Sequence, residues 1–406
     1  MCCNINDREG QFCIKMGNCI SKNSVNSSDN ETDFSLVYRF GETADMSELF
    51  KSKSLKPSRT YYNSELMDTR MGEIRKSIIY IREHWNEYDD FLKDLREITK
   101  DVNFIKNENQ EMFDSIFLSK KEWATNETAK EVNNFNTIKL YSSDEGYTKI
   151  FSLVNRIFRQ DESVDFTKLI RSMVFLVELL NIDLFNYCLS EPKLVNFTGV
   201  VYRGMALPEE DFTAFENLME QPIADRIIAV PLSFMSTSTN INVAVDFIKY
   251  EIENVANAFP LMMKIHVIGL NPKYLDVYRT QFPSSVVSTI CAVSIKEVSS
   301  HENECEVLLR GPFFQVLQIY DSKKKRGIKR RMRILEMVML NTNRDHISTM
   351  QLGEQSDPAR ILFGTMVAIT RSEFAADFCR NNKLKNDEVE YRKVIEEKKS
   401  KLKELY

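Results

Sequence analysis

The sequence predicts an α+β fold, in which helices dominate the first half of the chain and strands the second. Two observations support this prediction. Apolar residues before about residue 190 recur at steps of three and four, the spacing of one face of a helix. After Gly199 the apolar runs become short, and they do not alternate strictly with helical patterns. That order favours antiparallel sheets.

Composition places the chain among globular proteins and narrows the partners that it can have. It has 406 residues, 43% of them hydrophobic and 28% charged, with a formal net charge of −5. Proteins that bind nucleic acid in bulk usually carry a basic surplus, so we expect no nucleic-acid partner. No apolar run is long enough to span a bilayer, and the first residues lack the pattern of a secretory signal. We therefore expect an intracellular, cytoplasmic protein.

The eight cysteines and four histidines form neither a metal-binding nor a disulfide pattern. Four cysteines crowd into the first nineteen residues, and the others are scattered without a CxxC pair or a histidine at ligand spacing. A disulfide framework does not suit an intracellular chain. We therefore expect no bound metal.

Residues 1–60 have the composition of a flexible polar leader, rich in Ser, Asn and charge. Within it, Gly17 follows Met16, and Ser21 has the offset of an N-myristoylation signal, with Cys19 available for palmitoylation. The signal acts only where Gly17 becomes N-terminal, and we would then expect a lipid-anchored contact with a membrane. The alternative is a chance match in a polar tail.

Residues 61–135 are predicted to be a helical N-terminal region. Twelve apolar residues from Met67 to Ile105 follow one another at steps of three or four, with charges on the other face. This stripe predicts one long amphipathic helix, which either forms a coiled coil or partner-binding arm or packs against its own domain. Two aromatic residues within the stripe favour packing. A second helical region is expected at 109–135.

Residues 136–345 are predicted to form the main α+β domain. It begins with two helical segments, YSSDEGYTKIFSLVNRIFR from Tyr141 and the more apolar FTKLIRSMVFLVELLNIDLFNYCL from Phe166. Strands follow, and the last two are joined by the basic turn KKKRGIKRR. The segments expected to be strands are VVYRGM, IIAVPLSFMSTST, LMMKIHVIGL, CAVSIKEV, CEVLL, FFQVLQIY and RILEMVML.

Residues 346–406 are expected to form a C-terminal extension. Its last part, from Lys383 to the end, is predicted to be a charged helix with few buried residues. Neither this extension nor the helical region contains a pattern that carries chemistry.

Three segments of the strand region carry polar residues at or near strand ends. Each segment alone has an ordinary structural explanation, such as a helix cap or a pair of surface glutamates. A carboxylate at the start of an apolar strand is nevertheless costly to bury unless a charge or a hydrogen bond requires it. The residues are Arg203 and Gly204 in VVYRGM, Ser236, Thr237 and Ser238 in FMSTST, and Glu304 and Glu306 in HENECEV.

In this order the three segments resemble the R-S-ExE signature of the arginine-specific mono-ADP-ribosyltransferases. The resemblance runs from about Tyr141 to Leu340, roughly half of the chain. It implies the fold of that family, two packed and mainly antiparallel sheets with flanking helices, preceded here by the helical N-terminal region. It also implies NAD as co-substrate and no metal. The first helical segment adds the marks Tyr141, Tyr147, Asn155 and Arg159.

The resemblance implies a role for each residue of the signature. Glu306 would hydrogen-bond the nicotinamide ribose and stabilise an oxocarbenium-like cation as the bond to nicotinamide breaks. Ser236 would hold Glu306 and the ribose. Arg203 would bind an NAD phosphate or the adjoining ribose, because its fork of donors suits phosphate oxygens. The further residues expected at NAD are Gly204, Thr237 and Ser238.

Glu304 is expected to bind the acceptor. A strand with a period of two would place Glu304 and Glu306 on one face, with Cys305 pointing away. Glu304 would then meet an incoming guanidinium in a bidentate pair. Within the family that the sequence resembles, glutamine at this position would imply other acceptors, so the resemblance with glutamate here implies arginine on a protein. The loop before it, residues 299–303 and called the acceptor loop below, would select the partner.

The signature leaves three functions open. The first is transfer of ADP-ribose from NAD to an arginine side chain of a protein, with release of nicotinamide. The second is an NAD glycohydrolase, in which water replaces the acceptor at the same site. The third is a non-catalytic scaffold that uses the helical N-terminal region. All four signature residues are present, which favours the two enzymes, and the N-terminal half would then position, inhibit or localise the catalytic domain.

Overall fold

The structure, a computed structural model, divides the chain into two compact units. The first unit holds the described residues up to 191 together with 295–306, and the second holds 197–294 and 307–405. The leader with Gly17 and the region 109–134 lie outside the described residues. The structure describes residues 76–77, 80–81, 84–100, 135–144, 146–151, 154, 167–191, 197–207, 209–229, 234–254, 259–283, 287–288, 290–310, 313–322, 331–344 and 358–405.

The first unit is built around helix α8, Thr167–Ser190, which the sequence predicted. Its residues from Ser172 to Leu184 are buried without interruption. A helix that is buried on all sides needs neighbours on all sides, which explains why α8 is the centre of this unit.

Helix α4, Tyr88–Lys100, packs against α8 through the apolar stripe. The rings of Tyr88 and Phe91 are buried, with centroids 5.2 and 5.5 Å from the ring of Phe175 on α8. The described part of the apolar stripe therefore packs within its own unit. Of the two alternatives, this is the one that the aromatic residues of the stripe favoured.

The prediction of one continuous helix over 67–105 is wrong in the part that the structure describes. The backbone leaves helical geometry at His84, and a short 3-10 helix, η2, Trp85–Glu87, precedes α4. The ring of His84 stacks on Tyr80 at 4.0 Å, and its Nδ1 lies 2.9 Å from the Tyr80 carbonyl oxygen. These local contacts compete with a regular helix at this point.

Helix α6, Asn136–Ser142, also contacts α8. The backbone N–H of Thr137 in its first turn donates to Oδ2 of Asp183 on α8 at 2.8 Å, and both residues are buried. A carboxylate at a helix N-terminus satisfies donors that the helix itself leaves open. The sequence predicted a longer helix here, but α6 ends at Ser142 and a π-helical turn, η4, Gly146–Phe151, follows.

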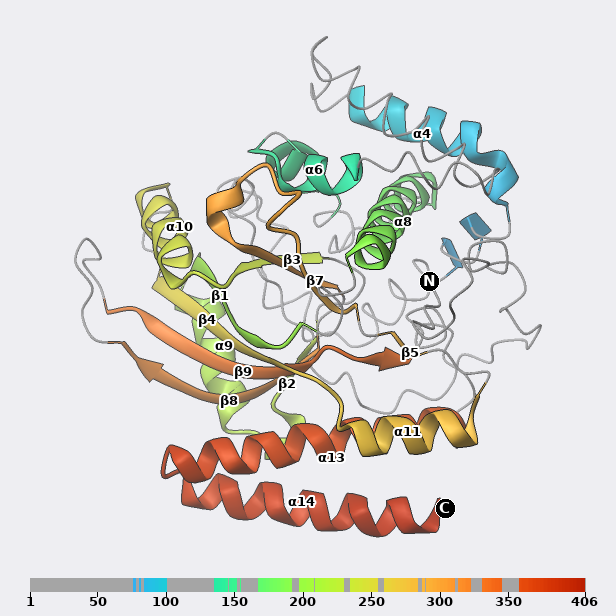
Figure 1. The fold of residues 1–406 in the computed structure, drawn as a ribbon. Coiled ribbons are helices and arrows are strands. Elements are labelled where there is room, and N and C mark those ends of the chain that lie inside the picture. Colours follow the sequence, from blue (N-terminus) through green and yellow to red (C-terminus); the bar gives the residue numbers. More distant parts are fainter. Residues whose placement is uncertain are drawn as a thin grey trace. The chain divides into compact units, whose positions relative to one another are not determined.

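The second unit is built on one mixed sheet of eight strands, in the order β2-β8-β9-β4-β1-β3-β7-β6. Figure 1 shows β8, β9, β4 and β1 side by side. Strand β7 begins at Glu306, the last residue of the first unit. Each expected strand is present, with IIAVPLSFMSTST divided into β2 and β3. The bounds are β1 Gly199–Leu207, β2 Ile227–Ala229, β3 Phe234–Ser238, β4 Phe259–Ile268, β6 Ala292–Ser294, β7 Glu306–Arg310, β8 Phe313–Asp321 and β9 Arg333–Leu340.

The pairing is mainly antiparallel, as the family resemblance implied, but the two packed sheets that it also implied are not shown. All the expected strands belong to one sheet, and β4 and β9 in it run parallel. The only other pairing among the described residues is a short ribbon of β5, Val287–Ser288, and β10, Asn343–Arg344. Strands β8 and β9 form the antiparallel pair expected around the basic turn, whose tip lies outside the described residues.

Two helices cover opposite ends of one face of this sheet. The register pairs Met262 with Ile334, and both pack against α10, Ile241–Asn254. Four residues further along β4, the ring of His266 lies 5.3 Å from Phe374 on α13. Since side chains on a strand alternate with a period of two, residues 262 and 266 share a face.

Helix α13, Pro358–Asn381, was not predicted, whereas the charged helix α14, Lys385–Glu404, was. The two lie side by side (Figure 1). The helices α9, Glu209–Met219, and α11, Pro272–Gln281, were also not predicted. No helix in the described part of the chain is both long and apolar enough to cross a membrane. The buried residues of α14 are Tyr391, Ile395 and Leu402.

Glu336 on β9 is a carboxylate on the covered face, and it is only 2% exposed. Its Oε1 lies 2.5 Å from Nζ of Lys264 and 2.7 Å from Nε2 of His266, and its Oε2 accepts from Nε2 of Gln318 at 3.0 Å. Burial alone would raise the pKa of Glu336. The hydrogen bonds from these three neighbours outweigh burial and lower the pKa from its ordinary 4.5 to about 2.

We expect Glu336→Gln to lower the free energy of unfolding by about 2 kcal/mol at neutral pH. A carboxyl with a lowered pKa stabilises the folded chain above its unfolded value of 4.5, and this contribution is lost as pH falls towards 2. The difference between the wild type and the variant should therefore shrink over that interval. Urea unfolding at a series of pH values measures it.

A suitable control is Glu373→Gln, because Glu373 makes an exposed ion pair with Lys399 at 2.9 Å. Such pairs contribute about 0 to 1 kcal/mol, so the control should have little effect. A loss in Glu336→Gln that stayed constant down to pH 2 would contradict the role given to this carboxylate.

The packing of α10 on β1 can be tested at Gly204, because α10 lies directly over this residue. A Cβ at Gly204 would overlap with the backbone carbonyl of Ala244 on α10. We expect Gly204→Ala to destabilise the chain by about 1 to 3 kcal/mol, since helix and strand must separate. The matched control is Gly364→Ala on α13, where a Cβ meets nothing within 4 Å. Gly364→Ala should stabilise the chain by about 0.5 to 1 kcal/mol. Equal shifts in melting temperature for the two variants would contradict the close packing of α10 on Gly204.

Candidate active site

Arg203 and Ser236 lie on neighbouring strands of the second unit, β1 and β3, and are in contact. Nη1 of Arg203 donates to the backbone oxygen of Ser236 at 2.7 Å, and Arg203 is only 8% exposed. This bond uses the carbonyl oxygen of Ser236, and the expectation that Ser236 holds Glu306 and the ribose stays a prediction.

The other residues of the Ser-Thr-Ser segment have contacts that shape the fold. Oγ1 of Thr237 donates to the backbone oxygen of Val307 at 2.6 Å, which joins β3 to β7. Oγ of Ser238 accepts from the N–H of Asn240 at 2.9 Å, and Oδ1 of Asn240 accepts from Asn242 at 3.0 Å. These two bonds begin helix α10. The roles of Thr237, Ser238 and Gly204 at NAD stay predictions.

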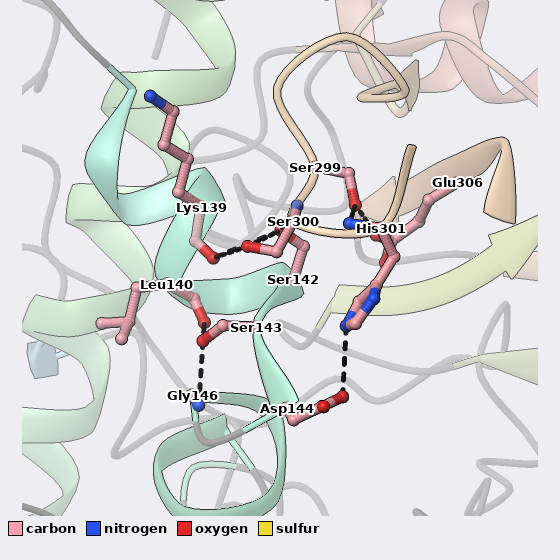
Figure 2. A network of polar contacts seen from close by, with 10 residues as sticks. All are labelled: Lys139, Leu140, Ser142, Ser143, Asp144, Gly146, Ser299, Ser300, His301 and Glu306. Atoms are coloured by element: carbon pink, nitrogen blue, oxygen red, sulfur yellow. Dashed lines mark hydrogen bonds and ion pairs between the residues drawn. The ribbon is translucent and has the colours of Figure 1, made fainter. Parts of the chain in front are cut away.

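Glu306 is the first residue of β7 and is 5% exposed. Oγ of Ser299 donates to its Oε2 at 3.1 Å (Figure 2). The backbone oxygen of Glu306 accepts from the N–H of Ile295 at 3.0 Å. A buried carboxylate persists in a fold only where hydrogen bonds or charges replace its water. Nothing in the sequence singled out Ser299 within the acceptor loop.

Glu304 does not lie in the strand, so the expectation that it shares a strand face with Glu306 is wrong. It ends a short 3-10 helix, η7, Glu302–Glu304, and Cys305 follows with φ 48° and ψ 49°. A residue in this left-handed region breaks the alternation of a strand. The position of Glu304 relative to Glu306 is therefore set by the turn at Cys305, and not by the alternation of side chains along a strand.

The environment of Glu304 favours its neutral form. Burial raises the pKa of Glu304 above its ordinary 4.5, the charge of His301 lowers it, and the charge of Asp144 raises it. Nε2 of His301 lies 3.1 Å from Oδ1 of Asp144, at the surface of the first unit (Figure 2). A cation brought to Glu304 would favour the ionised form, because an opposite charge offsets desolvation.

The acceptor loop is tied to the end of α6 (Figure 2). The N–H of Ser300 donates to Oγ of Ser142 at 2.9 Å, and Oγ of Ser300 donates to the backbone oxygen of Lys139 at 3.1 Å. The N–H of His301 donates to Oγ of Ser299 at 3.2 Å. The contacts to α6 join residues more than 150 positions apart, and a serine and a backbone carbonyl give no sequence signal for such a pairing.

Hydrogen bonds join Arg203 with Ser236 and Ser299 with Glu306. The strands that carry the signature are consecutive neighbours, in the order β1-β3-β7. Among the residues that the structure describes, no group of three or more His, Cys, Asp or Glu could hold a metal ion.

The helical marks of the resemblance are described only in part. Tyr141 is a core residue, 1% exposed, with its ring 4.6 Å from that of Phe151. Asn155 and Arg159 lie outside the described residues, and the side chain of Tyr147 is not described.

Comparison with known proteins finds similarity at the level of structure. No family model and no curated protein matches the chain. It is similar to the ADP-ribosyltransferase Vis, solved in complex with agmatine, at 15% identity over 51% of this chain and 74% of that one, with a TM-score of 0.33. It is also similar to the Vis toxin of Vibrio splendidus at 14% identity, over 58% and 86% of the two chains, with a TM-score of 0.33. Similarity this distant assigns no role to any residue.

The left-handed backbone at Cys305 can be tested by substitution. A β-branched residue is disfavoured there, so we expect Cys305→Val to destabilise the chain by about 1 to 2 kcal/mol. Glycine accepts this geometry without strain, so Cys305→Gly should stay within about 1 kcal/mol of the wild type. Thermal unfolding compares the variants. Cys305→Ala removes only the thiol, and a loss equal to that of Cys305→Val would show that sulfur contacts matter more than backbone geometry.

Proposed function

We propose that this chain is an NAD-dependent mono-ADP-ribosyltransferase that transfers ADP-ribose to arginine side chains of proteins and releases nicotinamide. The observation that carries the proposal is the order β1-β3-β7 in the sheet, in which neighbouring strands bear Arg203, Ser236 and Glu306. The same residues in the same order form the R-S-ExE signature that the sequence resembles. An NAD-splitting site of this kind needs a buried carboxylate, and Glu306 is buried.

In this chemistry the bond between nicotinamide and the ribose C1 breaks, and its electron pair leaves with nicotinamide. Positive charge then develops on the ribose ring, as in glycoside cleavage. The carboxylate of Glu306 stabilises this charge, which exists only near the transition state. A guanidinium nitrogen of the acceptor attacks C1 and gives up one proton.

Arg203 is proposed to bind a phosphate or the adjoining ribose of NAD. Its bond to the Ser236 carbonyl fixes the guanidinium against β3 before substrate arrives, which reduces the entropy lost on binding. Arginine suits this task because its planar fork matches phosphate oxygens and stays charged when buried.

Glu304 is proposed to bind the guanidinium of the acceptor. Burial raises the pKa of this carboxyl, and an incoming guanidinium would favour its ionised form. The partner is proposed to be a cytoplasmic protein with an exposed arginine. Membrane contact through a lipid on Gly17 is a further proposal, and this segment lies outside the described residues.

The decisive experiment incubates the full chain with labelled NAD and agmatine or polyarginine, and identifies the products by mass spectrometry. We expect ADP-ribosylated guanidine and free nicotinamide. Glu306→Gln should lower both transfer and NAD hydrolysis by about 100-fold or more, because it removes the charge that meets the cation. Exposed Glu390, paired with Lys393 on α14, provides the control Glu390→Gln, which should keep full activity.

Glu304→Gln separates the two enzymes. We expect it to abolish most arginine transfer while NAD hydrolysis continues. Transfer that persisted unchanged while hydrolysis fell would contradict the roles given to the glutamates. Nicotinamide release without any arginine product would identify a glycohydrolase, and no NAD turnover at all would favour the non-catalytic scaffold.

A further inference from the structure

We propose that Ser299 is a positioning residue that couples the acceptor loop to Glu306, so that NAD is cleaved fastest when the loop is seated against α6. This inference rests on the proposed function, because it assigns to one serine the link between acceptor recognition and glycosidic cleavage.

The hydroxyl of Ser299 joins two groups with different tasks. It donates to Oε2 of Glu306 at 3.1 Å, and it accepts from the backbone N–H of His301 at 3.2 Å. A serine hydroxyl has one proton to donate, so an N–H that occupies its lone pair also restricts where that proton points. Ser299 is 7% exposed, so water does not readily replace either partner.

The next residue anchors the same loop to α6. Ser300 donates through its N–H to Oγ of Ser142 and through its hydroxyl to the carbonyl of Lys139. Oγ of Ser142 in turn donates to that carbonyl at 3.2 Å. Hydrogen bonds thus tie Ser300 to α6 and Ser299 to Glu306, and the backbone joins the two adjacent serines (Figure 2).

The consequence follows from how a carboxylate responds to its donors. A loop displaced from α6 would withdraw the Ser299 proton, and a carboxylate that loses a donor takes up a proton more readily. Glu306 would then be less often in the ionised form that stabilises the cation. An acceptor protein that holds the loop against α6 would therefore raise the rate of NAD cleavage. Water in place of the acceptor would not raise this rate.

The test compares Ser299→Ala with Ser299→Thr, which keeps the hydroxyl. For Ser299→Ala we expect kcat for NAD cleavage to fall about tenfold, the effect of one lost hydrogen bond, with KM for NAD nearly unchanged. The acidic limb of the pH dependence of kcat should move to higher pH. Ser299→Thr should restore both kcat and the pH dependence of kcat to those of the wild type. The control is Ser372→Ala, which removes a buried hydroxyl on α13 in the second unit.

Ser142→Ala tests the same link from outside the site. We expect a smaller fall in kcat and a larger relative loss of arginine transfer than of hydrolysis, because the acceptor loop loses its anchor. If Ser299→Ala does not fold, Ser142→Ala alone tests the coupling of the acceptor loop to Glu306. A Ser299→Ala or Ser142→Ala enzyme with the kcat and pH profile of Ser372→Ala would overturn the inference. A wild-type chain without NAD turnover would instead overturn the proposed function.

Discussion

The burial of charged side chains among apolar strands is the constraint on which the rest of this structure depends. Arg203, Glu306 and Glu336 are 8%, 5% and 2% exposed. An ionised group in such surroundings is stable only where hydrogen bonds or opposite charges replace water. The bonds of these three residues to β3, to the acceptor loop and across β4, β8 and β9 therefore fix those segments together with apolar packing.

Glu336 and Glu304 also show how the surroundings of a glutamate decide the direction in which its pKa is shifted. Glu336 contacts Lys264, His266 and Gln318, whose hydrogen bonds lower its pKa, so its charge serves the fold. Glu304 is half-buried beside an imidazole and another carboxylate, and its pKa moves in the opposite direction. Hydrogen bonds from its neighbours favour the ionised form of Glu336, whereas burial disfavours the ionised form of Glu304.

Periodicity predicted the strands and α8 well, because those elements bury apolar residues in a simple repeat. It missed α13, which packs against the sheet, α11 and α14, so that its apolar residues face several directions and form no single stripe. The signature residues were found from their types and order. Their local geometry was not, because the left-handed backbone at Cys305 and the bonds of Ser299 depend on partners distant in the sequence. Cysteine gives no warning of φ > 0, as glycine or asparagine would.

The two glutamates of the signature differ more in their mechanical surroundings than their spacing suggests. Glu304 belongs to a single turn that ends at Cys305, and Glu306 begins a strand whose next residue is bonded to Thr237. A strand inside a sheet resists displacement, whereas a short turn held by a few loop contacts opens at low cost. Under the proposed chemistry, a fixed Glu306 suits a cation that forms at one place. An adaptable Glu304 suits arginines that arrive on protein surfaces of different shape.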